Sequence, residues 1–215
     1  MSPDPDLPNT WLPRTMAEAL PDLARGLART RRPVFLGARI RIRAAGRITW
    51  GRGSRIGRGS TVDGYASEGV VLGPGSRIGD YSTITCTSHV TRLGKGVSIG
   101  ARTGFGDYCH FGSSGGIVIG DDVLGGSYVS FHSQDHVFSD PHALIRDQGV
   151  TEGGIMIGDN CWIGAKVTFL DGAKVGSHSV VAAGAVVKGK FPDHSLIGGV
   201  PARLLRSLAS SATED

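Results

Sequence analysis

The chain has 215 residues, of which 40% are hydrophobic and 20% are charged, with a formal net charge of +4. That hydrophobic content is enough for a sizeable core, and a charged fraction below the average of about 25% argues against global disorder. No run of about 18 apolar residues occurs, which argues against a membrane-spanning helix, and the acidic start M-S-P-D-P-D is not typical of a secretory signal. Three widely spaced cysteines indicate neither a disulfide framework nor a zinc site, so a reducing, cytoplasmic compartment is expected.

The N-terminal segment is basic and predicts a helix. Residues 1–60 carry 12 of the arginines against 4 acidic residues. Thr15 and Glu18 have the spacing of a capping box, and leucines recur after them on one helical face. We therefore expect residues 1–33 to form a helical cap. We interpret its arginines as a solvated face that binds no nucleic acid, with docking on an anionic membrane surface as the alternative.

Residues 34–206 contain an internal repeat of six. Glycine makes up 34 of the 215 residues, about 16% against a background of roughly 7%, and many glycines follow an apolar residue that recurs every sixth position. The clearest run is Ile157, Ile163, Phe169, Val175, Val181 and Val187, and a shorter run begins at Leu93. Neither a helix nor a simple strand has this period. A chain that makes one short strand and one turn, three times per coil, does, so the repeat predicts a parallel β-helix with the apolar residues inside.

The repeat is interrupted by residues 132–154. This stretch is longer than the roughly 12–15 residues above which structureless loops are usually functional or disordered. It carries three histidines, His132, His136 and His142. A zinc site built on the first two, and histidines without a role, are both conceivable. We favour a general base, because a base with a pKa near 7 suits proton removal from a hydroxyl.

Three C-terminal motifs carry a family resemblance. They are I-M-I-G-D-N-C-W-I-G-A-K-V (155–167), A-G-A-V-V (183–187) and G-G-V-P-A-R-L-L-R (198–206). With them, the chain resembles the left-handed β-helix hexapeptide-repeat acyltransferases, in particular the O-acetyltransferases of sugars and polysaccharides of the maltose and galactoside acetyltransferase type. The resemblance implies an all-β, left-handed parallel β-helix over 34–206 with the inserted loop 132–154 and a disordered tail at 207–215. It also implies acetyl-CoA as donor, no metal, and a homotrimer with each active site between subunits.

The same resemblance suggests individual site residues. It implies that His136 is the catalytic base, with His132 as second choice, and that the backbone N–H of Ala165 stabilises the oxyanion. The residues expected to bind coenzyme A are Ala165 and Ala183 along the pantetheine arm and Lys188, Lys190, Arg203 and Arg206 at its phosphates, with either lysine as the contact. The candidates for the acceptor are Asp107 and Trp162.

The predicted function is acetyl-CoA-dependent O-acetylation of a sugar or surface-polysaccharide precursor. Because the thioester is already activated, direct transfer needs no covalent enzyme intermediate. Cys109 and Cys161 fall at small core positions of the repeat, which disfavours a cysteine nucleophile. The alternatives are N-acetylation of an amino sugar, acetylation of an antibiotic, or a metal-binding β-helix. The last would need three histidines from different coils, such as His89, His110 and His136.

Overall fold

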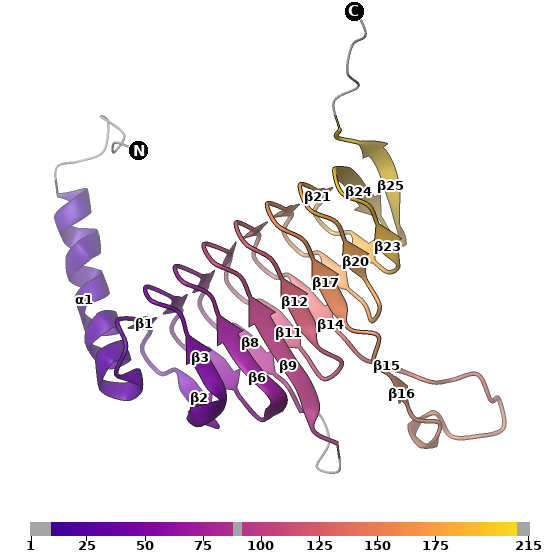
Figure 1. The fold of residues 1–215 in the computed structure, drawn as a ribbon, viewed down its shortest axis with the longest axis horizontal. Helices are drawn as coiled ribbons and strands as arrows, with labels where there is room; N and C mark the ends of the chain where they lie inside the picture. Colours follow the sequence, from indigo (N-terminus) through magenta and orange to yellow (C-terminus); the bar gives the residue numbers. More distant parts are fainter. Residues whose placement is uncertain (1–9, 88–91, 210–215) are drawn as a thin grey trace, which may run out of the picture.

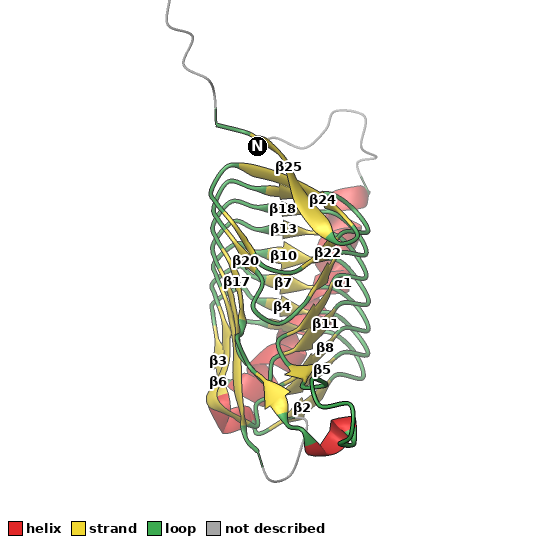
Figure 2. Cartoon of the chain, turned by 90° about the vertical axis from the view of Figure 1, so that its right-hand side faces the viewer, coloured by secondary structure: helices red, strands yellow, loops and turns green. Residues whose placement is uncertain are grey.

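The computed structural model describes residues 10–87 and 92–209 and shows a left-handed parallel β-helix, as predicted (Figures 1 and 2). Helix α1 (Trp11–Thr30) covers one end of the solenoid, and strand β25 closes the other (Figure 1). Each triangular coil contributes one short strand to each of three parallel sheets. Every apolar residue of the repeat can therefore stack on its equivalent in the next coil.

The three sheets are numbered by the order of their first strands along the chain. The first sheet consists of β1 (Phe35–Leu36), β4 (Arg55–Ile56), β7 (Arg77–Ile78), β10 (Gly104–Phe105), β13 (Leu124–Gly125), β18 (Trp162–Ile163), β21 (Val180–Val181), β24 (Ser195–Gly199) and β25 (Ala202–Ser207). The second sheet consists of β2 (Arg41–Arg43), β5 (Thr61–Asp63), β8 (Thr83–Thr85), β11 (His110–Gly112), β14 (Ser130–His132), β19 (Thr168–Phe169) and β22 (Val186–Val187). The third sheet consists of β3 (Ile48–Trp50), β6 (Ala66–Leu72), β9 (Gly94–Ile99), β12 (Ile117–Ile119), β17 (Ile155–Ile157), β20 (Lys174–Val175) and β23 (Lys190–Phe191).

The core follows the hexad register closely. Phe111, Phe131 and Phe169 are fully buried on successive coils of the second sheet, and their rings stack with centroids 5.0 and 4.9 Å apart. Phe105 meets this stack edge-on, and Gly125 of the next coil makes room for it. A Cβ on Gly125 would lie 2.1 Å from Cδ1 of Phe105. A large and a small residue thus alternate along the solenoid axis at this place, as close packing of the interior requires.

Three corners join the sheets, and they position the surface residues. The first corner leads from the first to the second sheet, the second from the second to the third, and the third back to the first. At the first corner, the left-handed position is taken by Tyr81, Tyr108 and Tyr128, with φ of 53°, 59° and 62°. Their rings stack with centroids 5.4 and 5.0 Å apart. Non-glycine residues at this φ are uncommon, and the repeat holds them there.

Helix α1 caps the N-terminal coil. It begins at Trp11 with Thr10 as its N-cap, so the capping box predicted at Thr15 is wrong: that residue lies inside the helix. Arg25 Nε donates to the carbonyl of Leu36 at 2.9 Å, and Arg29 also donates to a first-coil carbonyl. These arginines satisfy acceptors that would otherwise be orphaned at the open end of the solenoid.

Among the residues named above as members of the repeat, Leu93 is the exception. Leu93 does not join the core: its side chain is 53% exposed, because it follows a widened second corner. Among the residues with a described conformation, no helix is long and apolar enough to cross a membrane.

Candidate active site

The inserted loop leaves the solenoid at the second corner. It begins at the end of β14 and returns at β17, and it projects away from the coils (Figure 1). Inside it, β15 (Asp135–His136) and β16 (Val150–Thr151) form an antiparallel pair in which His136 lies opposite Val150. A 3-10 turn, η2 (Ile145–Asp147), precedes β16 on the returning half of the loop. The side chain of His136 is exposed.

A buried carboxylate fixes the returning end of this loop. Asp171 is 8% exposed and lies at the second corner of the following coil. Its Oδ2 accepts from the hydroxyl of Thr151 and the N–H of Gly153, and its Oδ1 accepts from the N–H of Gly154, all at 2.9 Å. Charge-assisted bonds of this kind are the strong ones among protein hydrogen bonds. The rigid coil therefore holds the base of a loop that would otherwise have few restraints.

The outgoing strand of the loop is tied by an ion pair. Nζ of Lys188 lies 3.2 Å from Oδ2 of Asp135. Because successive side chains of a strand point to opposite sides, His136 leaves the backbone on the side away from Lys188. The lysine predicted to meet coenzyme A therefore also positions the strand that carries the predicted base.

A polar pocket of about 360 Å³ opens beside the loop on the outer face of the second sheet. It is lined by Thr85, Thr87, His110, Gly112, Ser114, His132, Ser133 and Gln134. The rings of His110 and His132 lie side by side, with centroids 5.5 Å apart and planes tilted by 42°. Burial, and secondarily the neighbouring His132, lower the pKa of His110.

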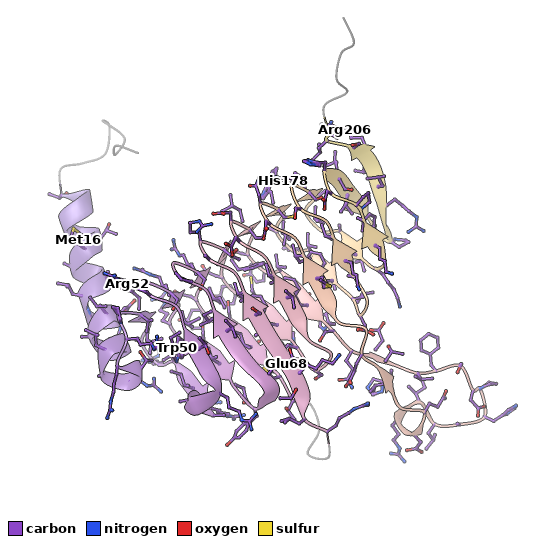
Figure 3. All side chains as sticks on the ribbon, in the orientation of Figure 1. Met16, Trp50, Arg52, Glu68, His178 and Arg206 are labelled. Carbon is purple, nitrogen blue, oxygen red and sulfur yellow. The ribbon has the colours of Figure 1, made fainter. Side chains whose placement is uncertain are left out.

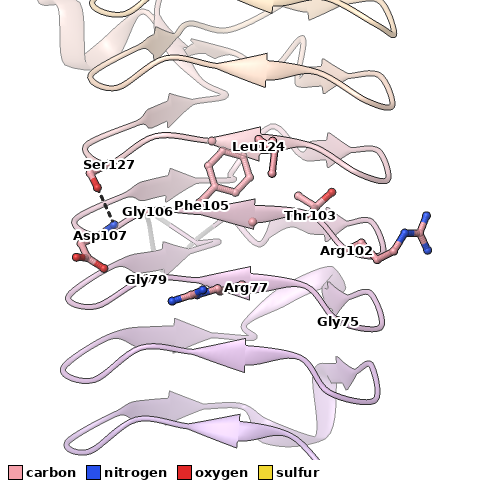
Figure 4. A pocket seen from close by; sticks show the side chains of 12 residues that line it. Gly75, Arg77, Gly79, Arg102, Thr103, Phe105, Gly106, Asp107, Leu124 and Ser127 are labelled. Carbon is pink, nitrogen blue, oxygen red and sulfur yellow. Dashed lines mark hydrogen bonds between the residues drawn. The ribbon is translucent and has the colours of Figure 1, made fainter. Parts of the chain in front are cut away.

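The first corner carries the other predicted residues. Asp107, Ser127, Ala165 and Ala183 occupy equivalent places on successive coils. The Oδ1 of Asp107 accepts the N–H of Asp80 at 2.8 Å, and the hydroxyl of Ser127 accepts the N–H of Asp107 at 3.1 Å (Figure 4). The column changes to alanine in the last two of these coils, and the left-handed position that follows it is taken by the exposed Lys166 in one and by Gly184 in the other.

A hollow of about 520 Å³ lies on the first sheet beside Asp107 (Figure 4). Gly104 forms its floor, because the equivalent outward places in the adjacent coils carry Arg77 and Leu124. Trp162 stands outward one coil beyond Leu124, and it is 60% exposed, so it does not pack in the core.

The remaining predicted basic residues lie at the C-terminal end. Arg203 and Arg206 are exposed on β25, which pairs antiparallel with β24 at the end of the solenoid far from Met16 (Figure 3). Lys190 is exposed on β23 of the third sheet, next to Lys174. The four predicted phosphate contacts are thus divided between two sides of the molecule.

The structure brings some predicted residues together and keeps others apart. His136 and Lys188 share the second corner, whereas Asp107, Ala165 and Ala183 share the first. Within one chain, the width of the second sheet separates these two groups. His89 lies outside the described residues, and the described part of the chain holds no group of three metal-ligating side chains.

The sequence did not point to Asp171 as part of this site, and it suggested His110 only as a ligand in the metal-binding alternative. Asp171 and Gly172 form a turn of a kind that can occur at any corner of the repeat. Asp171 acquires its role only through its hydrogen bonds to the returning end of the loop. His110 occupies an ordinary outward position, and its Nδ1 lies 2.7 Å from Oγ1 of Thr83 in the preceding coil. The alternation of β11 predicts an outward side chain, whereas its pairing with His132 depends on the register between coils.

Comparison with known proteins places this geometry in context. Residues 154–189 match the family model described as bacterial transferase hexapeptide (six repeats). Rv3034c of Mycobacterium tuberculosis, named a probable acetyltransferase, is 33% identical over 136 residues, which are 63% of this chain and 43% of that protein. WbbJ of Escherichia coli K12, whose name assigns it to O-acetyl transfer in lipopolysaccharide biosynthesis, is 32% identical over 107 residues, 46% of this chain and 55% of that protein. The chain spans about half the length of these curated relatives.

A solved structure supports the same fold. A mutant of AntD, an N-acyltransferase from Bacillus cereus in complex with dTDP and coenzyme A, aligns with a TM-score of 0.53 and 20% identity, covering 81% of this chain and 80% of that one. This likeness concerns the fold alone. Together with the family match, it confirms the resemblance to the hexapeptide-repeat acyltransferases and the left-handed β-helix expected from it.

Proposed function

We propose that this protein is an acetyl-CoA-dependent O-acetyltransferase that acts on a hydroxyl of a sugar or surface-polysaccharide precursor. The observation that carries the proposal is the inserted loop, which extends a histidine from a rigid solenoid at a tethered position. The hexapeptide-transferase match and the names of the relatives support acetyl transfer as the reaction class.

In the proposed mechanism, His136 acts as the general base. Its Nε2 takes the proton from the acceptor hydroxyl while that oxygen attacks the thioester carbonyl. The backbone N–H of Ala165 donates to the oxyanion, and the imidazolium returns the proton to the departing thiolate of coenzyme A. A base of this kind contributes about 10²–10⁴ in rate, and an oxyanion donor contributes on the order of 10²–10³.

The strip formed by Ala165 and Ala183 at the first corner suits the donor. The pantetheine arm is an extended chain, and the small side chains of Ala165 and Ala183 leave room for it along two coils, beside the exposed Lys166. The phosphates would meet Arg203 and Arg206 near the end of the solenoid, and guanidinium groups suit phosphate because they donate two parallel hydrogen bonds. Asp107 lies on the same corner two coils before Ala165, and Trp162 lies on the first sheet in the coil of Ala165 itself; we place part of the acceptor between them.

We further propose that the chain works as a homotrimer. The predicted base lies on the second corner and the predicted donor strip on the first, so one chain does not unite them. A second copy that brings its first corner to this second corner would complete a site, and a closed ring of three gives three such sites. Its mass would be about 67 kDa, three times the 22.4 kDa of one chain.

The first experiment replaces the base. His136→Ala should lower kcat by about 10²–10⁴, while the KM for acetyl-CoA and the assembly state stay unchanged. His142→Ala is the matched control, because it removes an exposed histidine from the same loop. A larger loss in His132→Ala than in His136→Ala would move the base to His132, and no loss in either would refute general-base catalysis.

A second experiment tests the site between chains. His136→Ala and Ala165→Trp chains, each inactive alone, are co-refolded in equal amounts and assayed for release of the coenzyme A thiol. With random assembly of trimers, about one quarter of the sites combine an intact loop with an intact strip. Recovery near this fraction supports a shared site. Continued inactivity of mixed oligomers, verified by mass spectrometry, would refute it.

A further inference from the structure

The polar pocket on the second sheet has a distinctive composition. Its lining side chains are hydroxyls, imidazoles and one amide, and none of the described residues that line it is a carboxylate, a lysine or an arginine. Anionic ligands are usually met by arginine or lysine, and ammonium groups by carboxylates. A lining of neutral groups that both donate and accept instead matches a ligand with several hydroxyls.

His110 is held in place by its neighbours. Its Nδ1 is 2.7 Å from the hydroxyl of Thr83, which fixes the plane of the ring. Its Nε2 lies over Gly112, where even a Cβ would be only 3.0 Å from that nitrogen. A side chain at this outward position would displace the imidazole, so the glycine opens the pocket floor and admits the ring.

The electrostatics keep this group uncharged at neutral pH. Burial and the neighbouring His132 both lower the pKa of His110, which favours the neutral ring. The hydroxyl of Thr83 can donate to Nδ1 or accept from it, so Nε2 can carry a hydrogen or a lone pair. A neutral imidazole of this kind can either donate a hydrogen bond to a ligand hydroxyl or accept one from it.

The pocket also has the right location. Ser133 and Gln134 line it, and they lead directly into the strand that carries His136. Lys188 holds Asp135 on the other side of that strand. A ligand in the pocket would therefore lie at the foot of the loop, on the side of the strand opposite the lysine.

We propose that this pocket binds an uncharged pyranose ring of the acceptor through its hydroxyls, with His110 as the recognition group. The proposal rests on the acetyltransferase function proposed above and narrows its substrate class. The acceptor ring is a neutral sugar, and it is neither an amino sugar held as an ammonium ion nor a uronic acid. His110 is a binding residue in this scheme, and His136 remains the base.

Saccharide binding can be measured without coenzyme A. Methyl glucopyranoside, methyl galactopyranoside and methyl mannopyranoside are titrated into the full chain, with methyl glucosaminide and methyl glucuronide as charged counterparts, using saturation-transfer NMR and calorimetry. We expect at least one neutral glycoside to bind, and His110→Ala to raise its Kd about 5- to 10-fold, as the loss of one hydrogen bond to a neutral ligand implies. Gly112→Ala should do the same by displacing the ring.

The control is Thr61→Val, which changes a residue on the same sheet face two coils away from His110. It should leave the Kd unchanged, and thermal melts verify that every variant is folded. The inference is overturned if no neutral glycoside binds, if the charged glycosides bind better, or if neither His110→Ala nor Gly112→Ala changes the Kd. It is also overturned if His110→Ala dissociates the oligomer without changing the Kd, because the face would then be a contact between chains.

Failure of this inference and failure of the proposed function are distinguishable. If acetyl transfer to a saccharide is observed but the pocket variants do not change the acceptor KM, the function stands and the pocket assignment fails. If neutral glycosides bind in the pocket but no acetyl-CoA is consumed with any acceptor, the pocket assignment stands and the transferase function fails.

Discussion

Asp171 offers a sharp test of how the solenoid controls the inserted loop. Its carboxylate accepts three hydrogen bonds at 2.9 Å, from the Thr151 hydroxyl and from the N–H groups of Gly153 and Gly154. Hydrogen bonds to charged groups contribute about 1.5–3 kcal/mol each. The three donors lie on a partly exposed segment that water can reach, so Asp171→Ala should cost less than the sum of three such bonds, about 2–4 kcal/mol.

That free energy should appear as local opening of the loop base. The solenoid beneath has its own ladder of hydrogen bonds, so opening can stay confined to the returning segment. A cost of 2–4 kcal/mol corresponds to roughly 30- to 1,000-fold faster exchange of the Gly153 and Gly154 amide hydrogens. Because the loop then holds His136 less firmly, kcat should fall while the KM for acetyl-CoA changes little.

The assay is hydrogen–deuterium exchange of the peptide that contains residues 150–157, measured beside turnover. Asp171→Asn should give an intermediate result, since the amide keeps one acceptor but turns an NH₂ group toward donors. Asp159→Ala is the matched control, because its carboxylate also accepts a backbone N–H, that of Asp121, but at the third corner. Unchanged exchange and turnover in Asp171→Ala would refute the idea that this carboxylate anchors the loop.

Three further predictions concern the core and the titrating groups. Gly125→Ala should destabilise the fold by about 1–3 kcal/mol through overpacking against Phe105, whereas Gly104→Ala, whose Cβ would be 3.9 Å from its nearest neighbour, should be neutral in urea denaturation. Burial raises the pKa of Cys109 to about 11 and also raises the pKa of Cys86 and Cys161. A disulfide reagent at pH 8 should therefore label none of the three thiols before the protein unfolds. Fast labelling of the native protein would contradict this prediction. The pKa of His110 is lowered below its ordinary 6.5, so the contribution of its neutral ring to folding stability is complete above pH 6.5 and is lost as the pH falls through the pKa of the folded state. The Tm difference between wild type and His110→Gln should therefore shrink below pH 6. A Tm difference that stays constant with pH would contradict the lowered pKa.

Much of the fold could be predicted from the sequence because the repeat is strict. A residue buried once per hexad, such as Ile163 or Val181, predicts the coils and their core, whereas the left-handed winding was predicted from the family resemblance. The helix start was mispredicted because Thr15 and Glu18 have the spacing of a cap within a longer helical segment. Leu93 was mispredicted because the count of six fails where a corner lengthens.

The architecture of the site was less predictable, for a physical reason. In a solenoid, a surface residue has its neighbours about one coil away in the chain, and every insertion changes that distance. His110 and Thr83 are 27 residues apart, whereas Asp171 meets the loop across 17 to 20 residues. No single period connects these pairs, so a spacing argument that finds the core cannot find them.

The departures from the repeat are themselves informative. A coil that only supports its neighbours needs one apolar residue inward and a tight corner, and most coils here contain little more. The lengthened second corner after β8, the glycine floors at Gly104 and Gly112, and the inserted loop all fall between residues 86 and 154. Each removes packing or adds chain at some cost in stability, and together they border the hollow beside Asp107 and the polar pocket beside the loop. Acceptor specificity should therefore vary with substitutions in these coils, whereas the regular coils that follow, which carry Ala165 and Ala183, suit a donor that many acceptors can share.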